Sequence, residues 1–443
     1  MTRIYGAQQF RFDPASEAVI VAGLGADGEN AASLTNPQPV TAKLSDSPAL
    51  GPFGWLRTAA PQYVFDSQMT YDLQPLLFEQ VTSGSGASIV HNSTNRNAVM
   101  TFSATPTGGK CYMQQYEHNR YQPGRGQAAF ITGNFIEHAP NCLKWLKYGV
   151  GEAGNGVALE SNGTGWQVTL YSDTAEGDQT KLQSQWNLDH LDGTGASGID
   201  LQVSKGVIFF LDLQSLYYGR VRCCVDVDGV AVCFHEFLNA NVLAKPYIQT
   251  ANLPISAGMT CSGTVSTTME FTCCSVLSEG GQEDIGGFPF SVEGTVTAAN
   301  GAQTHILSVR PKTTFNSLTN RSKFVLDSVE VLVTGANPIK WELCLGQAIT
   351  GTTTFSNVNA TYSAMQFNTA GTISGAPALV IQAGYVPASN QAKGVSQSKV
   401  PMKYPITLDA AGAVRAMGTL SLLVTGIGGT SACRATMNWK ELR

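Results

Sequence analysis

The sequence predicts an all-β protein with two β-sandwich, jelly-roll-like domains and an extended N-terminal arm. Short apolar runs that alternate with polar residues recur at spacings of about 8 to 12 residues, between turns rich in Gly, Asn and Ser. No long window sustains the 3.6-residue period of an amphipathic helix, so we expect helix in less than about one tenth of the chain. The length of 443 residues is about three times that of a typical domain, which favours two or three domains.

An N-terminal arm and anchoring segment is expected over residues 1–95. Within residues 1–50, prolines at positions 14, 37, 39 and 48 separate short apolar pieces such as residues 18–22. Such a segment has no self-contained apolar face, so we expect it to become ordered only on the surface of a partner.

Two domains follow, a β-sandwich over residues 96–283 and a C-terminal β-sandwich over residues 284–443. A polar, Gly-rich run from Gln282 to Gly287 marks the linker between them. Strands are expected, in order, at residues 88–91, 98–103, 111–116, 127–135, 156–159, 165–171, 219–226, 231–236, 288–296, 304–310, 324–334, 339–344, 378–383 and 419–425.

The clearest local signal is the dipeptide Asp228-Gly229 between two alternating runs. A two-residue type I′ turn needs positive φ at both central residues, which Asp and Gly tolerate. This turn predicts the facing pairs Val227 and Val230, Val225 and Val232, Cys224 and Cys233, Cys223 and Phe234, Arg222 and His235, and Arg220 and Phe237. The valines would face the core.

Cys224 and Cys233 would therefore face each other closely enough for a disulfide, on the side away from the valines and within reach of oxidant. The chain has ten cysteines, two pairs of them adjacent in sequence. Neighbours on a strand point to opposite faces, so such pairs do not suit zinc. Three alternatives stay open: buried free thiols, disulfides formed after release from a reducing cell, and a bond from Cys224 to a neighbouring subunit.

A second turn is expected at Pro123-Gly124, because Pro and Gly together are typical of a tight turn. The flanking Arg120 and Arg125 are expected to be structural and to donate to loop carbonyls or to a carboxylate.

Candidate catalytic residues are few. Asp189, Asp192 and Glu236 could supply a pair of carboxylates for glycoside cleavage. Asp189 and Asp192 lie in the run Asp-His-Leu-Asp-Gly-Thr-Gly, however, which is also typical of an ordered turn, and we favour that interpretation. The histidines lack the spacing of a metal site, and no Gly-rich run completes a phosphate-binding motif. We expect no catalytic residues, metal or cofactor.

The formal net charge of -5 arises from only 13% charged residues, with no local cluster of Lys and Arg. Such a chain attracts neither phosphate backbones nor anionic lipid, so we expect no nucleic-acid or membrane partner. The N-terminus lacks an apolar signal-peptide core, and Asp212 interrupts the most apolar run. We expect no signal peptide and no membrane span.

Several stretches resemble a family of structural proteins from tailed-bacteriophage virions, with coverage from about residue 70 to the C-terminus. They are Arg120-Tyr-Gln-Pro-Gly-Arg-Gly-Gln127, Gln185-Trp-Asn-Leu-Asp-His-Leu-Asp-Gly-Thr-Gly195, His235-Glu-Phe-Leu-Asn-Ala-Asn241, Ser275-Val-Leu-Ser-Glu-Gly-Gly281, Leu307-Ser-Val-Arg-Pro-Lys-Thr313 and Tyr404-Pro-Ile-Thr-Leu-Asp-Ala-Ala411. The density of adjacent cysteines departs from that family.

The resemblance implies a structural component of the virion, assembled in the bacterial host cytoplasm, that decorates or connects the head, collar or tail. We expect a homo-oligomer, with a trimer as the first choice, that contacts other virion proteins and is not an enzyme. One alternative is an adsorption module that binds a receptor or host surface glycan through Trp145, Trp166, Tyr217 and Tyr218. A polysaccharide depolymerase is the other.

Overall fold

The computed structural model describes residues 8–13, 18–23, 61–103, 109–279, 287–377, 379–388, 395–399 and 406–443. Every regular element in these ranges is a β-strand, apart from one turn of 3-10 helix at Gln183–Gln185. The all-β prediction is confirmed. No helix in the described ranges is long and apolar enough to cross a membrane.

The chain divides into two units, residues 1–47 and residues 48–443. The described part of residues 1–47 is an antiparallel pair of strands, β1 (Gln8–Asp13) and β2 (Ala18–Gly23), with Phe10 opposite Val21 and Phe12 opposite Val19. Aromatic and β-branched residues at alternate positions favour such pairing. This part of the predicted arm therefore contains a two-stranded sheet that the sequence analysis did not predict.

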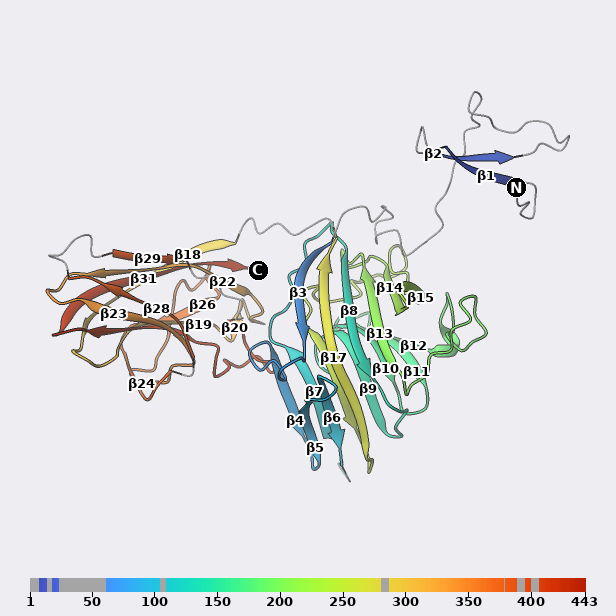
Figure 1. Ribbon diagram of the computed structural model, residues 1–443, viewed down its shortest axis with the longest axis horizontal. Coiled ribbons are helices and arrows are strands. Elements are labelled where there is room, and N and C mark those ends of the chain that lie inside the picture. Colours follow the sequence, from blue (N-terminus) through green and yellow to red (C-terminus); the bar gives the residue numbers. More distant parts are fainter. Residues whose placement is uncertain are drawn as a thin grey trace. The chain divides into compact units, whose positions relative to one another are not determined.

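The first sandwich has two antiparallel sheets, and β3, β17, β8, β13 and β14 lie side by side in one of them (Figure 1). One sheet has, in order, β12 (Gln179–Leu182), β11 (Trp166–Tyr171), β10 (Gly156–Ser161), β9 (Cys142–Gly149), β16 (Ile255–Cys261), β7 (Gly109–Gln115) and β4 (Phe78–Ser83). The other has β15 (Val230–Phe237), β14 (Val221–Val227), β13 (Gly206–Leu213), β8 (Gln127–Asn134), β17 (Thr267–Ser278), β6 (Asn97–Phe102) and β5 (Ala87–Asn92), while β3 (Gln62–Gln68) also pairs with β17.

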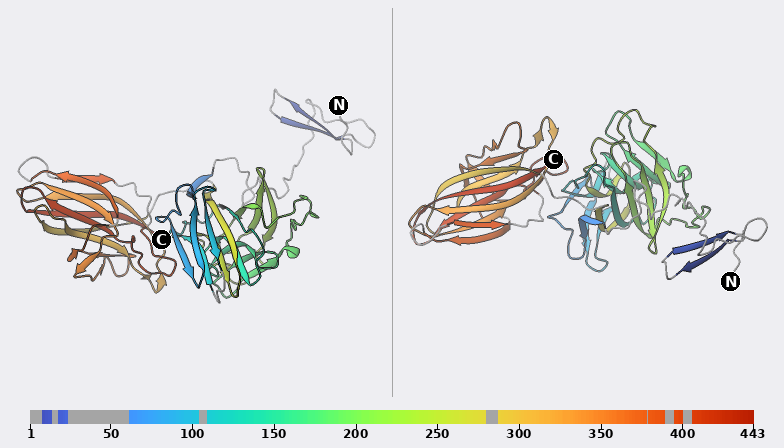
Figure 2. Two further views of the ribbon diagram at one scale, coloured as in Figure 1. Left: turned by 60° about the horizontal axis from the view of Figure 1, so that its bottom comes forward. Right: turned by 90° about the horizontal axis from the view of Figure 1, so that it is seen from above.

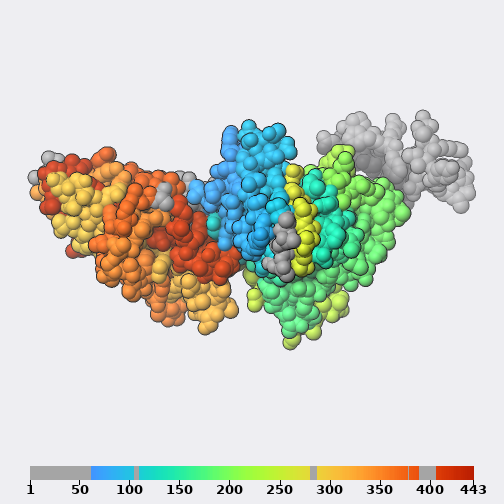
Figure 3. Space-filling model, turned by 90° about the horizontal axis from the view of Figure 1, so that it is seen from below, coloured from blue at the N-terminus to red at the C-terminus, as the bar shows by residue number. Residues whose placement is uncertain are grey.

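The core of this sandwich is one apolar cluster that includes Phe65, Phe78, Leu146, Phe209 and Phe271. Phe65 and Phe78 come from β3 and β4, and each packs edge-on against an aromatic neighbour. The chain from residue 61 onward thus belongs to the sandwich, earlier than the predicted start at residue 96. Figure 3 shows the blue surface of residues 61–103 beside the yellow surface of β17, to which β3 and β6 are hydrogen-bonded.

The second sandwich is built from two further antiparallel sheets, seen as separate layers in Figure 2. One contains β18 (Phe288–Ala298), β31 (Ser431–Leu442), β22 (Lys323–Val333) and β29 (Val395–Lys399). The other contains β25 (Ser356–Asn357), β26 (Met365–Asn368), β19 (Thr304–Pro311), β30 (Leu420–Gly426), β23 (Ile339–Leu345) and β28 (Leu379–Val386). Small two-stranded sheets are β20 (Thr314–Phe315) with β21 (Leu318–Thr319), and β24 (Ile349–Gly351) with β27 (Gly371–Ile373).

Alternation along the strands determines which side chains of this sandwich are buried. In β31, Cys433, Ala435, Met437 and Trp439 are buried at every second position. Their cluster includes Trp341 of β23 and is separate from the core of the first sandwich. The predicted linker at residues 282–287 lies almost wholly outside the described residues.

Candidate functional site

The β14–β15 hairpin turns at Asp228 and Gly229, whose φ angles of 54° and 84° are both positive, as a type I′ turn requires. Asp226 Oδ1 accepts a hydrogen bond from Gly229 N at 3.2 Å. A disulfide joins Cys224 to Cys233, which face each other with Cα atoms 3.8 Å apart. The register predicted near the turn is the one observed as far as this pair.

Beyond Cys224 the predicted register is wrong, because a β-bulge inserts one extra residue into β15. Cys223 lies opposite His235 rather than Phe234, Arg222 opposite Glu236 rather than His235, and Phe237 opposite Val221 rather than Arg220. The bulge lets Phe234 and His235, which are sequence neighbours, both be buried. Phe234 packs against Trp186 with ring centroids 4.2 Å apart.

The expected exposure of the disulfide is also wrong for Cys224. Its side chain is fully buried in a small apolar cluster with Phe210 and Leu277 on the outer face of the sheet, while Cys233 is half-buried. Arg222 on the same face is buried and forms an ion pair with Asp212. Solvent therefore reaches the disulfide from the side of Cys233. The expected core position is wrong for Val227 and Val230 next to the turn, which are exposed.

A second disulfide, between Cys142 and Cys261 on the paired strands β9 and β16, was not predicted. The two cysteines are 119 residues apart in sequence, so no local turn connects them. Six further cysteines are free thiols. No three His, Cys, Asp or Glu side chains of the described residues are grouped to hold a metal ion.

The predicted turn at Pro123-Gly124 is present in the main chain. Arg125 N donates to Gln122 O at 3.1 Å, and Gly124 has a φ of 92°. The carbonyl of Arg120 accepts a hydrogen bond from Gln127 Nε2 at 3.0 Å. The expected roles of the Arg120 and Arg125 guanidinium groups stay predictions.

This turn supports an unusual loop between β13 and β14. Ser215, Leu216 and Tyr217 have φ angles of 52°, 48° and 62°, a run of three non-glycine residues in the left-handed region. The hydroxyl of Tyr121 donates to Gln214 O and accepts from Leu216 N, each at 3.1 Å. Gly219 N donates a hydrogen bond to Ser215 O at 2.6 Å, which closes the turn. We call residues 215–218 the left-handed loop.

Of the four aromatic residues proposed for sugar binding, Trp145 and Trp166 are buried and cannot stack on a ligand from solvent. Trp166 Nε1 donates to Leu201 O at 2.8 Å inside the first sandwich. Tyr217 and Tyr218, in the left-handed loop, are 37% and 36% exposed.

Two of the three candidate carboxylates, Asp189 and Asp192, accept main-chain hydrogen bonds that stabilise turns. Asp189 accepts hydrogen bonds from Leu191 N and Ser197 N, both at 2.8 Å, and Asp192 accepts from Thr194 N at 2.9 Å. Burial raises the pKa of Asp189, but these main-chain hydrogen bonds outweigh it and hold the pKa below its ordinary value. Glu236 pairs with Arg220 at 3.5 Å. A general acid for glycoside cleavage needs a raised pKa, which Asp189 lacks.

A charged cluster that the sequence analysis missed lies on the outer face of the seven-stranded sheet. Glu160 is fully buried and accepts hydrogen bonds from Tyr171 Oη and Thr169 Oγ1, both at 2.6 Å, and from Gln167 Nε2 at 2.8 Å. Lys147 Nζ lies 3.7 Å from the centroid of the Tyr171 ring. Burial raises the pKa of Glu160 and lowers that of Lys147 to about 7.

Residues 149–155 cover this cluster. Val150 O accepts a hydrogen bond from Lys147 Nζ at 3.1 Å, Gly151 N donates to Gln114 Oε1 at 2.7 Å, and Glu152 binds Thr260 Oγ1 at 2.5 Å. A lysine with a pKa near neutrality can act as a base or nucleophile, but this one is sealed from solvent. The cluster therefore has a structural role in the sheet.

A polar joint connects the two sandwiches within residues 48–443, which form one compact unit. Glu79 accepts a hydrogen bond from Ala410 N at 2.6 Å, and Arg321 donates to the carbonyls of Asp409 and Ala410 at 2.6 and 2.9 Å. The Arg415 guanidinium lies 3.7 Å from the centroid of the Tyr116 ring. The segment around Asp409 is thus one link between the sandwiches, and the ion pair of Lys323 with Glu117 at 2.6 Å is another.

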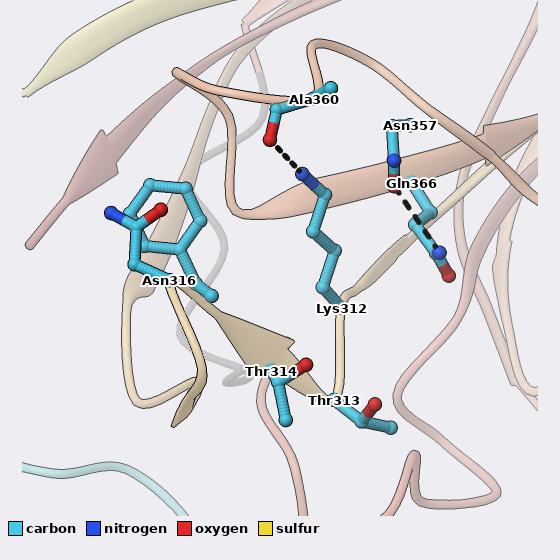
Figure 4. A pocket seen from close by; sticks show the side chains of 8 residues that line it. Lys312, Thr313, Thr314, Asn316, Asn357, Ala360 and Gln366 are labelled. Atoms are coloured by element: carbon cyan, nitrogen blue, oxygen red, sulfur yellow. Dashed lines mark hydrogen bonds between the residues drawn. The ribbon is translucent and has the colours of Figure 1, made fainter.

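The second sandwich also holds an open polar pocket of about 260 Å³ (Figure 4). It is lined by Lys312, Thr313, Thr314, Phe315, Asn316, Asn357, Ala360 and Gln366, none of which is acidic. Lys312 points across it toward Ala360 (Figure 4), and its Nζ donates to Asn359 O at 2.9 Å. No site in this sandwich was predicted, although Lys312 belongs to one of the stretches that carry the virion-protein resemblance.

No protein-family model matches the chain, and no curated protein matches it. Among solved structures, a glycosyl hydrolase family protein from Mycobacterium fortuitum is 13% identical, with a TM-score of 0.34 over 48% of this chain and 99% of that one. An endo-1,3-beta-glucanase from Streptomyces sioyaensis is 9% identical, with a TM-score of 0.34 over 50% and 97%. A carbohydrate esterase from the Shiga toxin-encoding bacteriophage phi24B is 9% identical, with a TM-score of 0.29 over 49% and 99%.

Proposed function

We propose that this chain is a non-enzymatic structural protein of a tailed-phage virion, located on the head, collar or tail. It assembles in the bacterial host cytoplasm as a homo-oligomer, with a trimer as the first choice, and contacts other virion proteins. Its partners do not include nucleic acid or membrane.

The observation that carries this proposal is the place of the resembling stretches in the fold. Residues 120–127 support the left-handed loop through Tyr121. Residues 185–195 form the turn held by Asp189. Residues 404–411 contribute Asp409 and Ala410 to the joint between the sandwiches. These segments stabilise the fold of the chain itself, and their resemblance to virion structural proteins is what supports the assignment.

The state of the charged groups supports a non-enzymatic role. Asp189 and Asp192 accept main-chain hydrogen bonds in turns, and Glu236 is ion-paired with Arg220. Residues 149–155 close off the Lys147–Glu160 cluster. The shifted groups of the Lys147–Glu160 cluster are buried, and the pKa values of Asp189 and Asp192 are lowered, whereas the general acid of glycoside cleavage needs a raised pKa and access to the substrate.

An exposed apolar surface supports assembly with a partner. Leu216, Tyr217 and Tyr218 of the left-handed loop are exposed, as are Leu238 and Val242 on the segment that follows β15. The two segments are linked, because Asn239 Nδ2 donates to Gly219 O at 3.0 Å. Contiguous exposed apolar side chains are typical of protein interaction surfaces.

Gold labelling tests the proposed location. Phage particles that encode this chain are purified on a density gradient and labelled with antibody against the recombinant protein. We expect label at one fixed place on each particle and, by analytical ultracentrifugation, a recombinant mass of three chains of 47.0 kDa. Intact particles that lack the chain altogether would contradict the virion assignment, and a stable monomer would contradict the trimer.

The two alternatives have separate tests. A depolymerase would lower the viscosity of host polysaccharide at protein concentrations far below that of the substrate, and such turnover would overturn the non-enzymatic assignment. An adsorption module would bind whole host cells and compete with the phage for them. We expect neither turnover nor competition.

A further inference from the structure

The pocket of the second sandwich lies between short strands and their loops (Figure 4). One wall is the short hairpin of β20 and β21, which turns at Asn316 and Ser317 with φ angles of 49° and 66°. Asn320 holds the base of this hairpin, since its Nδ2 donates to the carbonyls of Lys312 and Ala364, both at 2.9 Å. The pocket is thus formed before any ligand arrives, which lowers the entropic cost of binding.

The opposite wall consists of amide groups and carbonyls. Gln366 Oε1 accepts a hydrogen bond from Arg310 Nε at 3.3 Å, and its Nε2 makes only a long contact of 3.5 Å with Asn357 Oδ1. Asn359 accepts from Thr361 N and Tyr362 N, which fixes the loop that carries Ala360. The amides of Gln366 and Asn357 can therefore exchange a weak mutual contact for hydrogen bonds to a ligand.

Lys312 gives the pocket its charge. The residue is 7% exposed, and its ammonium group donates to Asn359 O at 2.9 Å and contacts Ala360 O at 3.5 Å. An ammonium group has three N–H donors. Two of them bind these carbonyls, so one N–H group remains for a ligand. Because carbonyls carry no formal charge, a ligand carboxylate would supply the countercharge that the pocket lining lacks.

Two arginines and one buried carboxylate surround the pocket. Arg443 lies 4.9 Å from the Phe315 ring centroid, and Arg310 contacts the Gln366 amide. Glu441 is fully buried and accepts hydrogen bonds from Ser363 Oγ at 2.6 Å and Ala364 N at 2.7 Å. It lies 3.9 Å from Arg443 Nε and offsets one of the three positive charges of Lys312, Arg310 and Arg443. The surroundings thus favour an anion.

The volume and the lining of the pocket indicate which class of anion fits it. At about 260 Å³ the pocket is smaller than those of drug-sized ligands, roughly 300 to 1,000 Å³. Amides and hydroxyls, which both donate and accept, match the hydroxyl groups of a sugar, whereas a bare phosphate or acetate would leave most of them unused. The Phe315 ring at the edge offers an apolar surface for the carbon face of a sugar ring.

We propose that this pocket binds a single acidic sugar residue, a hexuronic acid, whose carboxylate pairs with Lys312 and whose hydroxyls bind Gln366, Asn357 and Asn316. Binding is a property of the second sandwich and does not require the proposed place of the chain in a virion.

Isothermal titration of the full chain with methyl glucuronide tests the proposal, with methyl glucoside, acetate and inorganic phosphate as comparison ligands. We expect saturable millimolar binding of the glucuronide and at least tenfold weaker binding of the three others. Equal binding of glucoside and glucuronide, or no saturation by glucuronide up to about 50 mM, would overturn the proposal. Equal binding of acetate or phosphate would show an unspecific anion site and would overturn it as well.

Variants locate the site. Lys312→Met removes the charge and keeps the aliphatic stem, and we expect at least a tenfold loss of glucuronide affinity. Lys340→Met is the matched control, because Lys340 lies on β23 of the same sandwich in an ion pair with Glu342 and does not line the pocket. We expect less than a twofold change from it. If Lys312→Met does not fold, Gln366→Leu replaces it, and unchanged affinity in that variant would place the sugar elsewhere.

Discussion

The hydroxyl of Tyr121 accepts a hydrogen bond from Leu216 N and donates one to Gln214 O, each at 3.1 Å. One side chain of the 120–127 turn thereby satisfies two main-chain groups, one directly before the left-handed loop and one within it, 93 and 95 residues further along the chain.

Tyr121→Phe should therefore destabilise the protein by about 1 to 3 kcal/mol, because it leaves main-chain groups without their partner. Urea unfolding measures the change, and hydrogen exchange should show faster exchange confined to residues 214–219. Tyr385→Phe is the control, since Tyr385 is 70% exposed. Equal effects of the two variants would contradict a supporting role for Tyr121.

The two disulfides should differ in their contribution to stability. Loop-closure entropy predicts about 3 kcal/mol for the Cys224–Cys233 bond and about 5 kcal/mol for the Cys142–Cys261 bond, whose sequence separations are 9 and 119 residues. The double variants Cys224→Ala/Cys233→Ala and Cys142→Ala/Cys261→Ala, unfolded under oxidising conditions, give the comparison. Peptide mapping without reductant should find both linked pairs, and a 223–233 link would contradict the observed register.

The buried Lys147 should make stability rise with pH above neutrality. In the unfolded chain its pKa is about 10.5, whereas burial lowers the folded-state pKa to about 7. Between these values the unfolded state binds the additional proton, so the free energy of unfolding increases as the pH rises. We expect the stability of the wild type relative to Lys147→Met to increase from pH 7 to pH 10. A flat difference over this range would show that Lys147 keeps its proton.

Gly195→Ala should destabilise the turn that Asp189 holds. An added Cβ would lie 2.1 Å from Asp189 Oδ1, so the carboxylate would have to leave its main-chain partners, at a cost of about 1 to 3 kcal/mol. Gly206→Ala is the control, because an added Cβ there meets no atom within 4 Å. Thermal unfolding measures the midpoints of both variants, and we expect a lower midpoint for Gly195→Ala than for Gly206→Ala. Equal midpoints would mean that the turn accommodates the added Cβ without loss of stability.

Local signals in the sequence were sufficient for the hairpin at Asp228-Gly229, since two adjacent residues determine both the turn type and the facing cysteines. The bulge could not be predicted in this way, because it places Phe234 against Trp186. Trp186 lies outside the hairpin sequence, so no local pattern indicates this contact. Cys142–Cys261 and Lys147–Glu160 likewise depend on which strands become neighbours. The pocket was missed for the same reason, since its residues come from three short strands, β20, β25 and β26, and from loops.

The left-handed loop also has an energetic consequence. Glycine adopts positive φ freely, whereas a residue with a side chain gives up roughly 1 to 2 kcal/mol of stability there. Leu216 and Tyr217 occupy such positions although their side chains are 44% and 37% exposed and add little to the core. Leu216→Gly and Tyr217→Gly should raise the unfolding midpoint. The chain is thus less stable than it could be, and what it gains in exchange is a surface of fixed shape, available to a neighbour without further ordering.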